Sequence, residues 1–323
     1  MRAAFYEAFG DPALVLQTGD RPKPEPKPGQ ARVRMVRSAI HNHDLWMVRG
    51  SYGVRPPLPA IAGSEASGVV DALGEGVTGL HVGQRVSGFA NGAWAEYFVT
   101  PAAGLLPLPD AVTDDVGCQL VAMPLSAMTL VDHYAVKPEE WLVQNAANGA
   151  VGKTLATIAK SRGINVVHLV RSDDAIRELA AAGIDNAIST GDVDWKDRVK
   201  ELVGDGRVVY GFDSVGGKGS ADLAAVLSPG GTVVAFGSMT GEPMQITSGE
   251  LIFRAIKIEG FWLSTYPQTA TDRTRRIRDL IALIASGALS LPVAGTYKLE
   301  EAAEAAAASV SAGRRGKVLL AGN

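Results

Sequence analysis

A glycine turn between two apolar runs is the part of this sequence best suited to chemistry. Residues 141–144 are apolar and strand-like, residues 145–152 read Asn-Ala-Ala-Asn-Gly-Ala-Val-Gly, and the stretch up to Gly163 has apolar residues at helical spacing. A second apolar run, residues 164–170, completes a strand–helix–strand unit of about 30 residues. The N–H groups and the dipole at the start of such a helix can bind a pyrophosphate. The pattern therefore predicts a dinucleotide-binding turn.

This turn departs from the usual glycine pattern at one position. Ala146 stands where the first glycine is expected, whereas Gly149 and Gly152 occupy the second and third positions. Glycine at these positions lets the backbone approach the phosphates and lets the helix pack on the sheet. The same pattern also suits a tight turn in an α/β protein that binds no nucleotide, so this alternative stays open.

The residue after the second apolar run indicates which dinucleotide binds. An acidic residue there would accept a hydrogen bond from the ribose 2′-OH, whereas an arginine can pair with a 2′-phosphate. The residue is Arg171, which favours NADPH. Asp173 and Asp174 could instead form an NAD site. We favour them as first-turn residues of the next helix, with Ser172 as its N-cap, because acidic side chains there complement the helix dipole.

Strands and helices continue to alternate after this unit, which is typical of a doubly wound parallel sheet with its ligand at the carboxyl ends of the strands. The hydrophobic spacing predicts further helices over residues 173–182, 194–203 and 217–227, and further strands over residues 187–188, 208–213, 232–236 and 257–262. A helix around residues 277–284, another from residue 300 and a strand over residues 317–320 are expected to return to the first domain.

The first hundred residues have β character. Alternating runs such as residues 31–36 and 94–99 are separated by glycine and proline clusters, and no long helical pattern interrupts them, so we expect a small antiparallel domain. The prolines of residues 22–29 cannot donate to a sheet, so this stretch is expected to be an extended surface connector. A ligand for a proline-recognition module is the less favoured alternative.

Length and composition indicate a globular protein of two domains. The chain has 323 residues, of which 46% are hydrophobic and 20% charged, and its net charge of −3 offers no basic surface for nucleic acid. The single cysteine, Cys118, excludes an internal disulfide and a multi-cysteine zinc site, and is expected to be a buried apolar residue. Apolar stretches are too short to span a membrane, and the opening residues are strand-like, so we expect a cytoplasmic protein.

The whole chain resembles the medium-chain dehydrogenase/reductase superfamily. The resemblance starts with the opening strand, passes through residues 79–86 (Gly-Leu-His-Val-Gly-Gln-Arg-Val) and the glycine turn, and ends at residues 316–318. It implies an α/β fold in which a doubly wound parallel (Rossmann) sheet domain is joined to a GroES-like antiparallel β domain. The expected boundaries are residues 1–120 with 266–323 for the GroES-like catalytic domain and residues 121–265 for the Rossmann domain.

Three segments resemble the zinc-independent members of this superfamily, namely the mitochondrial-type enoyl-thioester reductases and the NADPH quinone oxidoreductases. They are residues 50–59, 213–218 and 260–264. A catalytic zinc needs three protein ligands. At the positions where the zinc branch has Cys, His and Cys, this chain has His41, Ser64 and Ala122. A different metal site, built from His41, His43, Asp44 and Glu65, is an alternative with too few well-spaced ligands.

The resemblance also implies the site residues. Tyr52 matches the tyrosine of the enoyl-thioester reductases, which would hold the substrate carbonyl or supply a proton, although an aromatic packing role is the alternative. Lys317 matches a residue near the cofactor. The remaining expected cofactor contacts form a phosphate turn, a 2′-phosphate end and a nicotinamide side: Asn148, Gly149, Ala150, Val151 and Gly152; Arg171, Ser172 and Asp173; and Phe236, Gly237, Ser238, Met239, Phe261, Trp262 and Leu263.

These observations predict an NADPH-dependent reductase of activated C=C bonds, with a 2-enoyl thioester as the favoured substrate. A quinone or a small enone is the second candidate, because Met123-Pro124 and His41-Asn42 replace Asn-Pro pairs of the enoyl-thioester reductases. A structural or RNA-binding protein that binds NADPH is a third reading. We expect a homodimer joined through the apolar strand at residues 257–262, without nucleic-acid or membrane partners.

Overall fold

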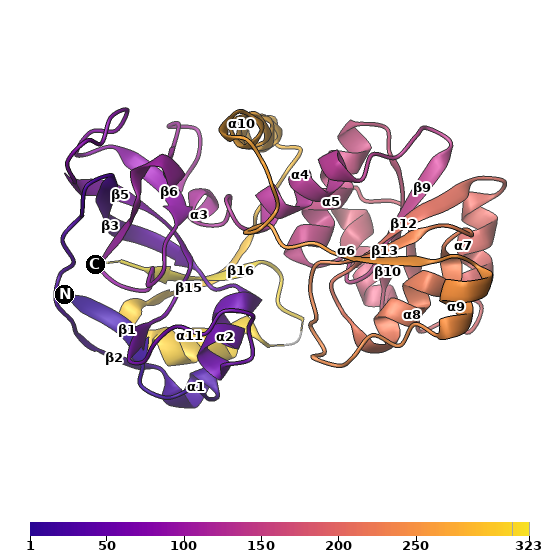
Figure 1. Ribbon diagram of the computed structural model, residues 1–323, viewed down its shortest axis with the longest axis horizontal. Helices are drawn as coiled ribbons and strands as arrows, with labels where there is room; N and C mark the ends of the chain where they lie inside the picture. Colours follow the sequence, from indigo (N-terminus) through magenta and orange to yellow (C-terminus); the bar gives the residue numbers. More distant parts are fainter. Residues whose placement is uncertain (312, 323) are drawn as a thin grey trace. The chain divides into compact units, whose positions relative to one another are not determined.

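The computed structural model describes residues 1–311 and 313–322. The chain divides into two compact units, which Figure 1 shows with most of their helices and strands labelled. Unit 1 consists of residues 1–122 and the described residues from 281 onward, and unit 2 consists of residues 123–280.

This division differs from the expected boundaries mainly in residues 266–280, which the sequence assigned to the first domain. They lie with unit 2 because Asp132 accepts hydrogen bonds from both Arg275, at 2.5 Å, and Arg276, at 2.7 Å. The same carboxylate accepts from Arg162 at 2.7 Å. Three guanidinium groups therefore converge on one side chain and attach this segment to the first helix of unit 2.

Unit 2 is built on six parallel strands in the order β11-β10-β9-β12-β13-β14, which is the doubly wound order that the sequence predicts. Helices lie on both sides of this sheet (Figure 1). The strands are β9 (Glu140–Gln144), β10 (Asn165–Val170), β11 (Ala187–Ser189), β12 (Arg207–Asp213), β13 (Thr232–Ala235) and β14 (Lys257–Gly260). The helices are α4 (Met123–His133), α5 (Ala150–Ser161), α6 (Asp173–Ala181), α7 (Trp195–Val203), α8 (Gly217–Val226), α9 (Ser248–Phe253) and α10 (Ala270–Ala285), the last of which runs on into unit 1.

The predicted helices and strands of unit 2 are confirmed to within a few residues at their ends. Val143, Val167 and Val233 from the central strands pack with Trp195 and Val199 of α7 in one core. The sequences of these strands are apolar at successive positions because helices cover both faces of a parallel sheet and bury its side chains. Strand β14 is shorter than predicted and lies at the edge of the sheet.

Unit 1 contains two sheets, which are antiparallel except for one parallel pair, β15 with β16. The first sheet consists of β1 (Arg2–Tyr6), β2 (Gln17–Asp20) and β4 (Ala60–Ile61). The second consists of β3 (Gln30–Ala39), β5 (Glu65–Leu73), β6 (Arg85–Phe89), β7 (Tyr97–Pro101), β8 (Leu106–Pro107), β15 (Val293–Lys298) and β16 (Lys317–Ala321). The C-terminal strand β16 pairs with β3, so the predicted return of the chain to this unit is confirmed.

The short helices of unit 1 are α1 (Pro12–Val15), α2 (Asn42–Arg49), α3 (Asp114–Gly117) and α11 (Ala302–Ser309), with 3₁₀ turns η1 (Ala102–Gly104) and η2 (Leu299–Glu301). Helix α2 was not predicted, and it matters for the site. It forms because Leu45 and Val48 are buried in the core of unit 1 and because Gly50 ends the helix in the left-handed conformation, at φ 72°.

Two further expectations for unit 1 are confirmed. Cys118 is fully buried against Ala39 and Leu319, and burial raises the pKa of its thiol well above the usual value. Residues 22–29 form no strand and are mostly exposed.

Among the described residues, no helix is both long enough and apolar enough to cross a membrane.

Candidate functional site

The predicted glycine turn lies at the carboxyl end of β9 and opens helix α5. Gly149 is the N-cap of this helix, and Asn148, Gly149 and Ala150 are exposed. The first N–H groups of a 12-residue helix therefore face outward without side-chain caps. Such an end can bind a phosphate.

Two residues of the turn show why small side chains are needed there. A Cβ on Gly152 would lie 2.5 Å from the carbonyl oxygen of Ala147, so this position is closed to larger residues. Ala146 occupies the place of the first glycine and has φ 47°, in the left-handed region that favours glycine. The turn thus keeps the backbone path of a glycine-rich loop although one glycine is replaced.

Two buried polar side chains, Gln144 and His168, support the turn through hydrogen bonds. The Nε2 group of Gln144 donates to the carbonyl oxygen of Gly152, at 2.9 Å, and to Nδ1 of His168, at 2.7 Å. Gln144 and His168 are 1% and 5% exposed. Burial lowers the pKa of His168 to about 4, so this imidazole is neutral at pH 7 and accepts through Nδ1. Sequence reasoning did not single out this pair.

The three residues of the predicted 2′-phosphate end follow the next strand, β10. Arg171 is exposed, and Ser172 is the N-cap of α6, where its hydroxyl accepts from the backbone N–H of Ala175. Asp173 lies in the first turn of that helix and is exposed. The predicted capping role of Ser172 is confirmed. Its O–H remains able to donate to a phosphate while the oxygen accepts from the helix.

The predicted nicotinamide-side residues follow β13 and β14. Phe236 donates its N–H to the carbonyl oxygen of Asp213, and Phe261 donates to that of Ala235. Ser238, Met239 and Trp262 are exposed. Because the strands are parallel, the segments after β9, β10, β13 and β14 all lie at the same edge of the sheet.

A network between β9 and β12 completes this edge, and sequence reasoning missed it. Asn145 donates to Asp213 at 2.7 Å and accepts from the backbone N–H of Ser214 at 2.9 Å. Asp213 also accepts from the hydroxyl of Ser220 at 2.6 Å. Asp213 is the last residue of β12, a central strand of the doubly wound sheet, and that position was the signal that could have identified it. The network holds the two central strand ends together.

In unit 1, Tyr52 lies in the turn that follows α2. The backbone N–H groups of Ser51 and Tyr52 both donate to the carbonyl oxygen of Trp46, at 2.9 and 3.2 Å. A Cβ on Gly50 would lie 2.8 Å from Phe9, so this residue must be small for the turn to pack. The packing of Gly50 and these hydrogen bonds therefore fix the position of the Tyr52 backbone. The ring of Tyr52 lies 5.7 Å from that of His43.

A second network in unit 1 lies at the start of α2. His41 and Glu65 are fully buried, and His41 Nε2 is 2.8 Å from Glu65 Oε2. The carboxylate of Glu65 also accepts from the backbone N–H groups of Val121 and Ala122. Burial raises the pKa of Glu65 well above its usual value and lowers that of His41 well below its own, so the pair favours a neutral imidazole.

Lys317 is almost fully buried at the start of β16, with Nζ 3.5 Å from the carbonyl oxygen of Ile40. Burial and the nearby Arg314 lower its pKa to about 8, although Asp44 and Glu65 oppose this shift. Burial also lowers the pKa of His43. Lys317 therefore contributes positive charge to the buried network near neutral pH.

The residues at the zinc positions of the wider superfamily do not fit a zinc ion. Ala122 has no donor atom in its side chain, the Ser64 hydroxyl lies 2.6 Å from His43 Nε2, and His41 Nε2 is engaged by Glu65. A catalytic zinc needs three protein ligands, and these positions offer one nitrogen. Among residues 1–311 and 313–322, no three His, Cys, Asp or Glu side chains are grouped so that they could hold a metal ion.

Two family models match the chain, one in each part of the fold. Residues 27–110 match the alcohol dehydrogenase GroES-like domain, and residues 150–286 match the domain described as zinc-binding dehydrogenase. These matches agree with the β-rich unit 1 and with the doubly wound sheet of unit 2.

Relatives and solved structures cover nearly the whole chain. The mitochondrial enoyl-[acyl-carrier-protein] reductase of Bos taurus is 31% identical over 314 residues, which span 93% of this chain and 83% of the relative. The Escherichia coli quinone oxidoreductase, solved with NADPH, is 27% identical with a TM-score of 0.91 and covers 99% of this chain and 100% of its own.

The Etr1p/Etr2p 2-enoyl thioester reductase of Candida tropicalis, at 22% identity and a TM-score of 0.85 over 99% of each chain, shares the fold. Fold, family models and relatives agree. The chain belongs to the medium-chain dehydrogenase/reductase superfamily, in the family that includes the mitochondrial enoyl-[acyl-carrier-protein] reductases.

Proposed function

We propose that this protein is an NADPH-dependent reductase that transfers hydride to an activated C=C bond, with a 2-enoyl thioester as the favoured substrate. One observation carries the proposal: four separate segments expected to bind NADPH end at one edge of the parallel sheet, around the uncapped start of α5. The relatives named as enoyl-[acyl-carrier-protein] reductases support the same substrate class.

The cofactor-binding residues divide by function. The backbone at Asn148, Ala150 and Val151 would receive the pyrophosphate. The N–H of Gly149 donates to the carbonyl oxygen of Ala146 and closes the turn, while Gly152 keeps the helix close to it. Arg171 would pair with the 2′-phosphate, supported by the hydroxyl of Ser172. The segments Phe236–Met239 and Phe261–Leu263 would contact the nicotinamide, and Lys317 would add a positive charge near the cofactor.

When bound, NADPH supplies a hydride. Its addition to the β-carbon of an enoyl thioester moves negative charge onto the carbonyl oxygen, and a proton must then reach the α-carbon. Tyr52 is the residue that would donate a hydrogen bond to this oxygen or supply the proton, because it carries a hydroxyl in a turn anchored to α2. No metal enters this mechanism, since His41, Ser64 and Ala122 do not form a zinc site.

Quinone reduction is the second candidate function. The E. coli structure that matches this fold is a quinone oxidoreductase, and the Asn-Pro pairs of the enoyl-thioester reductases are replaced at His41-Asn42 and Met123-Pro124. A quinone is already electrophilic and needs less help from a donor. A purely structural or RNA-binding role is less favoured, because Tyr52 is retained and the net charge is −3.

The substitution Tyr52→Phe tests the assignment. It keeps the ring and removes the hydroxyl, so we expect kcat with crotonyl-CoA to fall by about 10²-fold, kcat with a benzoquinone to fall much less, and NADPH affinity to stay nearly constant. Wild-type rates with both substrates would make Tyr52 a packing residue. A wild-type enzyme that reduces quinones but never the thioester would establish the second candidate instead.

Assembly and location complete the proposal. Strand β14 is an edge strand on which Ile258 is 44% exposed, and Ile252 and Phe253 at the end of α9 are 69% and 85% exposed. An exposed apolar edge needs a partner, which supports a two-fold homodimer through β14. We propose a cytoplasmic location, because the chain has a single cysteine, Cys118, which is buried and free. Fractionation of cells that express the protein would test it.

A further inference from the structure

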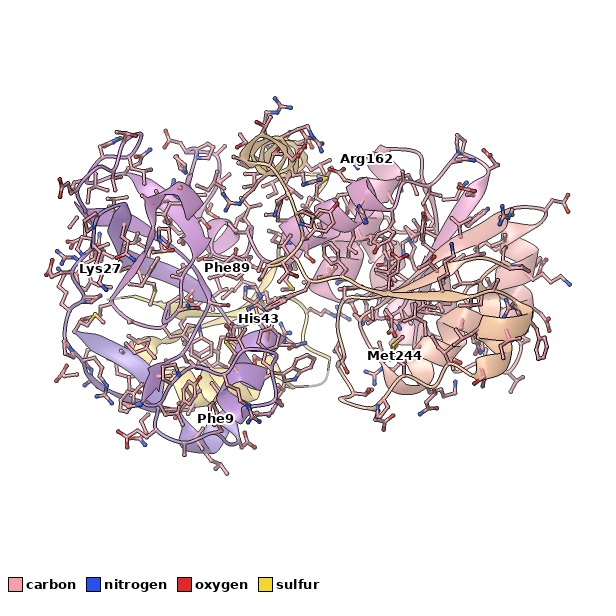
Figure 2. The ribbon with its side chains drawn as sticks, viewed as in Figure 1. Phe9, Lys27, His43, Phe89, Arg162 and Met244 are labelled. Atoms are coloured by element: carbon pink, nitrogen blue, oxygen red, sulfur yellow. The ribbon has the colours of Figure 1, made fainter. Side chains whose placement is uncertain are left out.

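The imidazole of His43 is held between three other rings in unit 1. The ring of His41 stacks on it at 5.1 Å with an interplanar angle of 14°. Tyr52 lies 5.7 Å away and Phe89 lies 6.5 Å away, each at 30°. Figure 2 labels His43 and Phe89 within this unit. His43 thus links a fully buried histidine to the ring of the proposed catalytic tyrosine.

Hydrogen bonding restricts rotation of the His43 ring. The Nε2 atom of His43 lies 2.6 Å from the hydroxyl of Ser64. Ser64 is 5% exposed, and the side chain of His43 is 15% exposed. Asp44 Oδ1 lies 3.6 Å from the same nitrogen and is buried without a hydrogen-bond partner among the described residues. A carboxylate at this point attracts the ring proton to Nε2, which favours donation from Nε2 to Ser64.

This arrangement is unsuited to nucleophilic catalysis by Ser64. A serine–histidine–aspartate triad uses one ring nitrogen for the serine and the other for the aspartate. Here Ser64 and Asp44 both approach Nε2. The contacts instead fix the plane of the imidazole, and a fixed plane can support a neighbouring ring.

We propose that His43, anchored by Ser64, is a positioning residue that holds the Tyr52 hydroxyl where it meets the substrate oxygen. The inference rests on the proposed function, because it takes Tyr52 as the donor. The N–H of Tyr52 anchors its backbone to α2, and the ring of His43, 5.7 Å from that of Tyr52, supports the tyrosine ring from the side. Displacing a catalytic group by about 1 Å can cost about 10²-fold in rate.

A double-mutant cycle in the full-length protein separates positioning from a general structural role. We would measure kcat for crotonyl-CoA, at saturating NADPH, in the wild type, His43→Ala, Tyr52→Phe and the double variant. His43→Ala should lower kcat by about tenfold or more in the wild type. In the Tyr52→Phe background it should change kcat by less than about twofold, because no hydroxyl remains to be positioned.

Three variants sharpen the cycle. His43→Phe keeps a ring beside Tyr52 and should retain more of kcat than His43→Ala, whereas Ser64→Ala should cause a smaller loss that also disappears without the Tyr52 hydroxyl. Phe89→Leu is the matched control: Phe89 also lies beside the His43 ring, but its side chain forms no hydrogen bond that fixes the plane of that ring, so it should show no coupling to Tyr52. If His43→Ala does not fold, His43→Phe and Ser64→Ala complete the same cycle.

A readout without turnover keeps the inference apart from the proposed function. With ¹³C-labelled tyrosine, the ring signal of Tyr52 is the one of seven that Tyr52→Phe removes. His43→Ala should shift or broaden that signal, and Phe89→Leu should leave it in place. An unmoved signal overturns the inference even when Tyr52→Phe lowers kcat.

The kinetic outcomes are equally distinct. A loss from His43→Ala that is equal in both backgrounds, or no loss at all, overturns the positioning role and leaves the proposed function standing. A Tyr52→Phe variant with the wild-type rate for crotonyl-CoA overturns both the donor assignment and the inference. In that case the tyrosine signal still reports whether the two rings touch.

Discussion

We expect the protein to become less stable at acidic pH, chiefly because of one buried histidine next to the glycine turn. His168 is 5% exposed on β10, and its Nδ1 accepts from Gln144, whose Nε2 also donates to Gly152. Protonation of His168 would place a charge in the core and remove that acceptor. Burial lowers its pKa to about 4 in the folded protein, against about 6.5 when unfolded.

The sign and size of the effect follow from linkage. Because the folded pKa is the lower one, the stabilising contribution is complete above about pH 6.5 and is lost as the pH falls towards 4. With these two pKa values the loss is about 2 kcal/mol at pH 5 and about 3 kcal/mol once both states are protonated. Such a loss is a large fraction of the stability of an ordinary domain.

Urea unfolding of the wild type and His168→Gln at pH 7.5, 6 and 5, at constant ionic strength, measures this loss. Glutamine keeps an acceptor for Gln144 but does not titrate, so from pH 7.5 to 5 the wild type should lose about 2 kcal/mol more than the variant. His81→Gln is the control, because His81 is exposed. Equal pH dependence in the wild type and His168→Gln would refute the reasoning.

Three further predictions concern the cofactor site and assembly. Arg171→Ala should weaken NADPH binding by about 2 kcal/mol and NADH binding little, as titration calorimetry would detect, and an equal loss for both would contradict the 2′-phosphate assignment. Gly152→Ala should lower stability by about 1–3 kcal/mol through its clash with Ala147, whereas Gly149→Ala, with its nearest atom at 3.1 Å, should mainly weaken NADPH. Sedimentation should give a dimer that Ile258→Arg dissociates, and a monomeric wild type at micromolar concentration would count against the β14 interface.

Hydrophobic periodicity was sufficient to predict most of the strands and helices of unit 2. The apolar run that becomes β9, the helical spacing of α5 and the run that becomes β10 are local patterns, and parallel strands covered on both faces require them. The turn residues Gly149 and Gly152 could be recognised for the same reason, since their spacing reflects a local backbone path. The capping role of Ser172 was likewise visible in its immediate neighbours.

Helix α2 could not be predicted in this way. Its eight residues include His43 and Asp44, and no long apolar stripe marks them as helical. The helix exists because Leu45 and Val48 reach a core assembled from distant strands, and because Gly50 packs under Phe9. Short helices depend on tertiary packing more than on local preference.

The sequence alone therefore determined the parallel sheet and the glycine turn, because each depends on residues close together in the chain. Motifs spread along the whole chain indicated the superfamily, and the position of Arg171 after the second strand predicts its pairing with a 2′-phosphate. Only the tertiary structure decided that Asn145 meets Asp213 across two strands, that Gln144 and His168 support the turn, and that Ser64 anchors His43 beside Tyr52. Those contacts join residues between 8 and 68 positions apart, and no periodic pattern in the sequence encodes them.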